Sequence, residues 1–139
     1  MSRVCILGDG GWGTALATVA CAHGHGVTVW GPFPDYIEQV RQTRENPTYL
    51  PGVVLPENIR WTADPEEAVH DAEVCVLAIP SRYFSSVMER FAGRIPESCD
   101  IMSVTKGLDE RTHQRMTDVA SQWMKGKPVA ALSGPSHAE

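Results

Sequence analysis

The feature that most constrains this chain is a glycine-rich segment near its start. Residues 3–17 read RVCILGDGGWGTALA, a short apolar run followed by four glycines in six positions and then by residues that favour a helix. The spacing of Gly8, Gly10 and Gly13 matches the G-x-G-x-x-G pattern of dinucleotide-binding folds. The order of strand, glycine turn and helix predicts a βαβ unit whose helix begins at a phosphate-binding turn.

Each glycine of this pattern has a physical role. Gly8 permits the tight turn after the strand, Gly10 lets the backbone approach a diphosphate, and Gly13 lets the helix pack closely on the sheet. The helix N-terminus then directs its N–H groups and the positive end of its dipole at the diphosphate. A glycine turn without a ligand is the competing interpretation, and the position between an apolar strand and a small-residue helix favours the dinucleotide.

Apolar runs and helical periodicities alternate along the rest of the chain. Strands are predicted at residues 4–7, 27–30, 59–62, 73–79, 100–104 and 128–132. Helices are predicted at residues 12–22, 36–44, 64–70, 83–91 and 110–124. This alternation predicts an α/β fold, a doubly wound parallel sheet with right-handed crossovers. The 139 residues are of a size for one domain, a Rossmann-like NAD(P)-binding domain spanning residues 1–139.

Helical spacing and capping rules also assign local details. Asp35 and Asp64 stand where the N-caps of two helices are expected. The apolar face of the first helix is assigned to Ala15, Leu16, Val19 and Ala20.

Composition and charge exclude several classes of function. The net charge is −5, and the 12 lysines and arginines are scattered, which argues against a nucleic-acid-binding surface. The apolar run before Gly8 is too short for a signal peptide or a membrane span, so we expect a cytoplasmic protein. No metal site is expected, because the four cysteines have no metal-ligand spacing and His23 and His25 fit a glycine-flanked turn better than a metal site.

The choice between NAD and NADP stays open from the sequence. An acidic residue at the end of the second strand favours NAD, and an arginine there favours NADP. Gly31 and Pro32 occupy that place. Asp35 follows, but its expected role as a helix N-cap already explains it.

The loops that follow the strands are where ligands bind in open parallel sheets. Lys106 stands in such a loop, whereas the other two lysines, Lys125 and Lys127, fall in an ordinary surface turn. An ammonium at a strand end can hold a substrate oxygen and polarise a carbonyl that accepts hydride. The competing interpretation, a solvated lysine in a turn, is about equally supported by these observations.

Five segments together resemble a known family. They are GDGGWGTALA, NPTYLPGVVLPEN, AIPS, KGL at residues 106–108 and the terminal LSGPSHAE. In this order they are similar to the bacterial-type NAD(P)-dependent glycerol-3-phosphate dehydrogenases. The resemblance implies that the dinucleotide is lined by Gly8, Gly10, Gly11, Trp12 and Gly13. It further implies that Lys106 contacts both NAD or NADP and the substrate, that Gly134 and Ser136 contact the substrate, and that Ala138 contacts the cofactor.

The chemistry that the resemblance implies is hydride transfer. Glycerol 3-phosphate and dihydroxyacetone phosphate would be interconverted with NAD(P)(H) for glycerophospholipid synthesis, with Lys106 orienting and polarising the carbonyl. The resemblance assigns no catalytic role to His137; it places the general base, a further lysine, and a helical substrate domain beyond Glu139, and it allows a homodimer. We therefore expect the domain to be truncated at its C-terminal end and to turn over little alone.

Two alternatives remain at this point. Another two-domain reductase, of the hydroxyacid or ketopantoate type, would share the N-terminal fold, although Trp12 and the YLPG and SGPS segments argue against it. A nucleotide-binding module without catalysis would need the glycine turn but has no evident use for Lys106.

Overall fold

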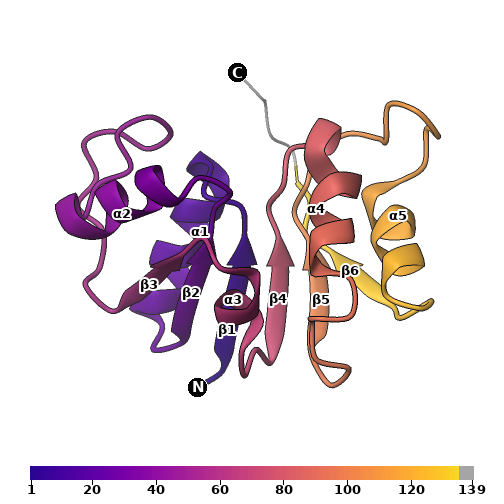
Figure 1. The fold of residues 1–139 in the computed structure, drawn as a ribbon, viewed down its shortest axis with the longest axis horizontal. Coiled ribbons are helices and arrows are strands. Elements are labelled where there is room, and N and C mark those ends of the chain that lie inside the picture. The colour runs from indigo at the N-terminus through magenta and orange to yellow at the C-terminus, as the bar shows by residue number, and fades with distance from the viewer. Residues whose placement is uncertain (135–139) are drawn as a thin grey trace.

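The computed structural model describes residues 1–134 as one parallel sheet with helices on both faces (Figure 1). The order of the six strands is β3-β2-β1-β4-β5-β6, and all neighbours pair in parallel. The strands are β1 (Arg3–Leu7), β2 (Gly26–Trp30), β3 (Ile59–Thr62), β4 (Val74–Leu77), β5 (Asp100–Ser103) and β6 (Val129–Ala131). The helices are α1 (Gly11–Ala22), α2 (Pro34–Thr43), α3 (Pro65–Val69), α4 (Phe84–Phe91) and α5 (Met116–Trp123), with a 3-10 turn, η1 (Ser81–Tyr83), before α4. This confirms the doubly wound α/β fold.

Two apolar cores lie on the two faces of the sheet. One packs α1 and α2 against β1, β2 and β3, through side chains such as Ala17, Val40 and Val29. The other packs α3, α4 and α5 against the opposite face, and α3 and α4 stand in front of the sheet in Figure 1. Strands covered on both faces need continuous apolar sequence, and the run at Val74–Leu77 supplies it.

Parallel pairing brings the carboxyl ends of the strands to one edge of the sheet, which we call the carboxyl edge. The strand order reverses between β1 and β4, because the chain builds outward from β1 to β3 and then returns to β4 beside β1. Ligands of open α/β sheets bind at such a reversal. The glycine turn after β1 therefore lies at the position where a ligand is expected.

Several local predictions need correction. The predicted helix at 110–124 begins only at Met116, since residues 108–115 form a loop closed by a bridge between Leu108 and Arg115. Asp35 is not an N-cap: α2 starts at Pro34, which fits the first turn, and Phe33 precedes it. Asp64 is confirmed as the cap of α3, where its side chain accepts a hydrogen bond from Glu66 N at 2.9 Å.

The predicted apolar face of α1 is only partly the face that turns toward the sheet. Val19 is 56% exposed, and Leu16 and Ala20 only pack at the margin of the core. The fully inward side is made of Gly13, Thr14, Ala17 and Cys21. Small residues face the sheet because α1 approaches β1 closely, and size rather than hydrophobicity decides which side turns inward.

The four cysteines are buried free thiols. Cys5 and Cys75 are register partners on β1 and β4, and a hydrogen bond between their side chains, together with burial, raises the pKa of Cys75. Lys127 is more than a surface-turn residue, because its Nζ donates to Glu97 O at 2.8 Å and to Cys99 O. Within residues 1–134, none of the helices is long and apolar enough to cross a membrane.

Candidate functional site

The glycine turn, residues 8–13, is packed so tightly that three of its glycines, Gly8, Gly11 and Gly13, have no space for a side chain. Gly8 has φ +126°, and a Cβ there would lie 2.2 Å from Ala78 O at the end of β4. A Cβ on Gly13 would lie 2.3 Å from Gly8 O. Gly8 and Gly13 therefore serve the close packing of turn, helix and strand, as the pattern predicts.

Gly10 has a different surrounding. A Cβ there would meet no atom within 4 Å among the described residues, so the turn opens toward solvent at this point. Gly10 is the N-cap of α1, and no side chain of residues 1–134 caps it. The first N–H groups of a helix have no partners within the helix, so they and the helix dipole favour an anion at this opening. The geometry fits the diphosphate of a dinucleotide.

The side chain of Asn46 anchors the glycine turn by hydrogen bonds. It is completely buried, and its Nδ2 donates to Asp9 O at 2.7 Å and to Thr14 Oγ1 at 2.8 Å. Its Oδ1 accepts from Tyr36 Oη at 2.5 Å and from Tyr49 N at 3.2 Å. One amide therefore links the turn to α2 and to the loop between α2 and β3, and it fixes the turn before any ligand binds.

The loop between α2 and β3 also restricts Gly11. A Cβ on Gly11 would lie 2.5 Å from Tyr49 O, so this glycine allows the close approach of that loop. Trp12, the next residue, is half exposed. The turn thus presents Gly10 and Trp12 outward, while Gly8, Gly11 and Gly13 provide room for neighbouring backbone.

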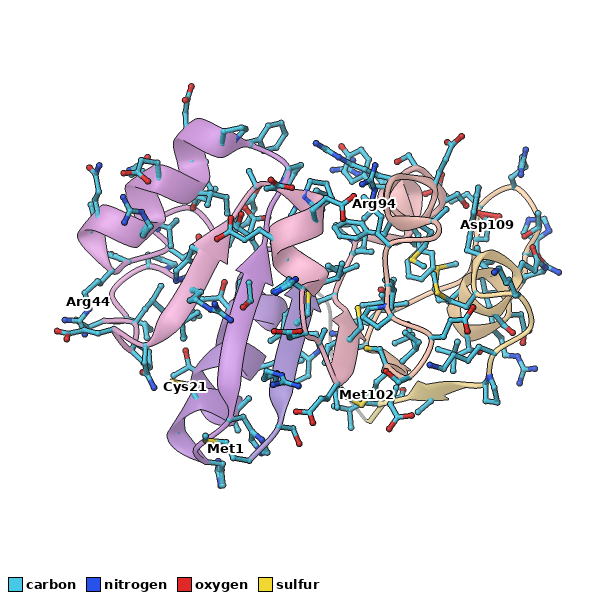
Figure 2. The ribbon with its side chains drawn as sticks, turned by 60° about the horizontal axis from the view of Figure 1, so that its bottom comes forward. Met1, Cys21, Arg44, Arg94, Met102 and Asp109 are labelled. Carbon is cyan, nitrogen blue, oxygen red and sulfur yellow. The ribbon has the colours of Figure 1, made fainter. Side chains whose placement is uncertain are left out.

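Lys106 follows β5 at the carboxyl edge, in a segment of residues 104–115 that we call the Lys106 loop. Thr105 fixes the base of the loop, since its Oγ1 donates to Ile79 O at 2.8 Å and to Leu77 O at 3.2 Å. Val104 N donates to Leu77 O at 3.0 Å and continues the β4–β5 ladder. Lys106 itself is exposed. Asp109, farther along the loop, lies at the end of the molecule opposite Arg44 (Figure 2).

Two adjoining hollows border Trp12 and Lys106. The smaller, about 390 Å³, lies against the glycine turn, the β4 end at Ala78 and the segment from Val104 to Lys106. The larger, about 660 Å³, lies on the other side of Lys106, against the start of α5 and residues 131–134 after β6. Trp12 and Lys106 line both hollows, so a ligand in one would lie next to a ligand in the other.

The structure describes some, but not all, of the residues that the resemblance assigned to the site. Gly10, Gly11, Trp12, Gly13 and Lys106 line the smaller hollow, and the exposed Gly134 lines the larger one. Gly8 is not among the residues that line either hollow. Ser136 and Ala138, and with them His137, lie outside the described residues.

Asp9 has an unusual environment within the glycine turn. It is only 8% exposed, and no group of residues 1–134 donates a hydrogen bond to its buried Oδ2. Loss of hydration on burial raises the pKa of this carboxyl group, and a hydrogen bond from its own backbone N–H partly offsets that effect.

The described residues contain no group of three or more histidines, cysteines and carboxylates placed to hold a metal ion. The two histidines of the turn after α1 contact backbone instead. His23 Nδ1 lies 2.9 Å from Val19 O, and His25 Nδ1 accepts from Ser2 N at 3.2 Å. Both rings are therefore part of the turn.

Sequence reasoning missed three residues of the site. Asn46 stands in a loop between prolines and glycine, and its contacts lie 32 and 37 residues away in the chain. Thr105 was passed over beside Lys106. Asp9 was passed over although an acidic residue among glycines at a predicted phosphate turn is a signal in itself.

Comparison with known proteins decides the family. Residues 3–139 match the sequence model described as the NAD-dependent glycerol-3-phosphate dehydrogenase N-terminus. The chain belongs to this family. It is 40% identical over 141 residues to the NAD(P)+ glycerol-3-phosphate dehydrogenase of Fusobacterium nucleatum, covering 100% of this chain and 42% of that protein.

A solved structure shares the fold of the domain. The glycerol-3-phosphate dehydrogenase of Coxiella burnetii superposes with a TM-score of 0.89 at 30% identity, over 98% of this chain and 42% of that one. The chain thus spans less than half the length of these relatives. It is an NAD-binding domain of the glycerol-3-phosphate dehydrogenase family, which decides against the other two-domain reductases.

Proposed function

We propose that this domain binds NAD(P)(H) for the interconversion of glycerol 3-phosphate and dihydroxyacetone phosphate. The diphosphate would be held by the N–H groups at the Gly10 end of α1, and the nicotinamide would lie toward the smaller hollow. When bound, the nicotinamide supplies or accepts the hydride. The observation that carries the proposal is that Trp12 and Lys106 line both hollows, so that cofactor and substrate would meet beside them.

Lys106 is proposed to act on the substrate side. Its ammonium group would hold the carbonyl oxygen of dihydroxyacetone phosphate and stabilise the negative charge that develops there as hydride arrives. Thr105 would position Lys106 by fixing the loop to the β4 end. Gly134 and Ser136 are proposed to contact the substrate, and Ala138 the cofactor. In this proposal the reduced product serves glycerophospholipid synthesis.

Residues 1–139 alone are proposed to bind nucleotide with little turnover. Lys106 and residues 130–134 are exposed, so water has access to the substrate side. Orientation of reactants and exclusion of water supply much of an enzyme's rate enhancement. A steady-state assay of the 139-residue chain with dihydroxyacetone phosphate and NADH tests this, and ordinary turnover would contradict it.

A chimera tests the role of Lys106. Residues 1–139 are joined to the remainder of the Fusobacterium relative, and oxidation of NADH is followed with dihydroxyacetone phosphate. Lys106→Ala should lower kcat at least about a hundredfold, in keeping with the loss of one charge-stabilising group, while the Kd for NADH changes only a few fold. Lys125→Ala is the matched control. If Lys106→Ala keeps ordinary kcat in an active chimera, the assignment of Lys106 is wrong.

A further inference from the structure

The end of β2 carries no ionisable side chain in this domain. Trp30 is the last residue of the strand, and Gly31 and Pro32 follow it. In dinucleotide-binding folds an acidic side chain near this place accepts a hydrogen bond from the ribose 2′-hydroxyl of NAD, and an arginine accommodates the 2′-phosphate of NADP. By sequence position alone, neither preference is encoded.

The structure supplies a carboxyl group to this place from another segment. A Cβ built on Gly31 would lie 2.5 Å from Asp9 Oδ2 and 2.6 Å from Asp9 Cγ. The Asp9 carboxyl group, which comes from the glycine turn, therefore occupies the space into which a side chain at position 31 would project. A side chain at position 31 would force Asp9 or Ile37, whose Cδ1 would lie 2.6 Å from the Cβ, to move.

One oxygen of the Asp9 carboxyl group, Oδ2, lacks a hydrogen-bond donor among residues 1–134. This oxygen is buried. A buried polar atom without a partner costs about 1–3 kcal/mol and is rare in native proteins. Its position beside the phosphate-binding turn makes a ligand hydroxyl a fitting donor. Such a donor would also favour the ionised carboxylate, opposing the rise in pKa that burial causes.

The arginines nearest in sequence to the end of β2 make other contacts. Arg41 forms an ion pair with Glu38 at 2.7 Å, and Arg44 forms one with Glu57 at 2.6 Å and also donates to Leu55 O. Figure 2 shows Arg44 at the outer end of the molecule. Both guanidinium groups are therefore engaged with partners of their own.

We propose that Asp9 selects NAD over NADP, by accepting a hydrogen bond from the adenosine ribose 2′-hydroxyl and by repelling a 2′-phosphate. The acidic residue that this fold commonly takes from the end of β2 comes here from the glycine turn, and Gly31 makes room for it. The inference rests on the proposed seating of the diphosphate at the Gly10 end of α1, since that seating brings the ribose over Asp9.

Titration with NADH, NADPH and 2′-deoxy-NADH tests the inference. The protein should bind NADH at least about tenfold more tightly than either of the other two, the range for a hydrogen bond to a charged group. Asp9→Ala should bring the three Kd values within about threefold of one another. Asp9→Asn, which keeps the size of the side chain, should relieve the discrimination against NADPH and serves if the alanine variant does not fold.

Asp35→Ala is the matched control. Asp35 is an exposed acidic residue in the first turn of α2, close in sequence to the β2 end, and the variant should keep the NADH preference. The Asp9 assignment is wrong if the unaltered protein binds NADPH as tightly as NADH. It is also wrong if the Asp9 variants keep the preference for NADH over NADPH, or if Asp35→Ala abolishes that preference. Failure to bind any of the three nucleotides would overturn the proposed diphosphate site as well.

Discussion

The glycine turn and the Lys106 loop lie at the same edge of the sheet but are held in different ways. The glycine turn is fixed by backbone contacts without spare room, at Gly8 against Ala78 and at Gly13 against Gly8, and by the buried amide of Asn46. The Lys106 loop is fixed at its base by Thr105, and from Lys106 to Leu108 it is exposed.

This difference separates two kinds of contribution to function. The glycine turn is preorganised, so the diphosphate that we propose to bind there would not need to order the protein. The Lys106 loop presents an exposed, charged side chain. We therefore expect substitutions in and under the glycine turn to change the free energy of unfolding, and substitutions at Lys106 to change chemistry with little change in stability.

The largest effect is expected for Gly8→Ala. The new Cβ would strike Ala78 O and the residue would keep a positive φ, so overpacking and strain together should cost about 3 kcal/mol or more of unfolding free energy. Gly10→Ala is the control within the same turn: its Cβ meets open space, so stability should change by less than about 0.5 kcal/mol. Urea denaturation measures both. Equal losses would show that the turn is not held by the Ala78 contact.

The next effect is expected for Asn46→Ala. It would remove the donor to Asp9 O and Thr14 Oγ1, which would keep only the long bond of 3.4 Å between themselves, and it would remove the acceptor of Tyr36 Oη and Tyr49 N. The loss should cost about 2–3 kcal/mol. NADH affinity should fall as well, because the turn loses its support. Asn58→Ala serves as the control, since Asn58 is exposed and its Oδ1 accepts a hydrogen bond from the Cys21 thiol. A cost below 1 kcal/mol at position 46 would contradict the supporting role.

A smaller effect of opposite sign is expected for Asp9→Ala without nucleotide. Burial raises the pKa of Asp9, so the folded protein disfavours the ionised form, and this cost is present at neutral pH and vanishes below the ordinary value of 3.8. The variant should be more stable by about 1 kcal/mol at pH 7, the lower end of the cost of an unpaired buried polar group. The gain should shrink as the pH falls. Thermal unfolding of both proteins between pH 7 and the ordinary pKa of 3.8 measures the gain in stability. A gain that grows toward acid pH would contradict the expected direction.

The smallest effect is expected at the amino edge of the sheet, opposite the carboxyl edge, where Lys127 and Cys99 precede β6 and β5. Lys127→Met would remove the donor to Glu97 O and Cys99 O at the start of β6 and should cost about 1 kcal/mol. Lys125→Met, two residues earlier, removes only an exposed ion pair of 3.8 Å with Glu97 and should cost less than about 0.5 kcal/mol. Denaturant midpoints compare the two. Equal costs would mean that Lys127 contributes no more than a surface charge.

The sequence was sufficient for the element order because strand and helix periods are local properties. The apolar run at Val74–Leu77 and the glycine spacing after β1 depend on neighbours a few residues away, and both predictions are confirmed. The face of α1 that packs on the sheet was predicted only in part, because the close approach of the helix places small residues such as Ala17 inward and leaves the larger Val19 exposed. The preference for small residues depends on the distance between helix and sheet, and that distance cannot be read from a local sequence pattern.

The supporting parts of the site were harder to predict for a related reason. Asn46 acquires its function only through partners that the fold brings to it, and Asp9 acquires its place through the absence of a side chain at Gly31. The sequence alone does not distinguish a polar residue that becomes buried from one that stays exposed. Lys106, by contrast, could be selected from the sequence since its position after a strand already places it at the carboxyl edge.

The strand order has a consequence for how this domain folds. β1 is made first, but Cys5 pairs with Cys75, so its second neighbour arrives only after 70 further residues have been added. Such long-range pairing is characteristic of slow folding. The glycine turn is completed by Ala78 and Asn46 from those later segments, so a competent nucleotide site forms late. A nucleotide that binds only the fully folded site would then stabilise the whole domain against unfolding. During synthesis, binding of that nucleotide would indicate that the domain has finished folding.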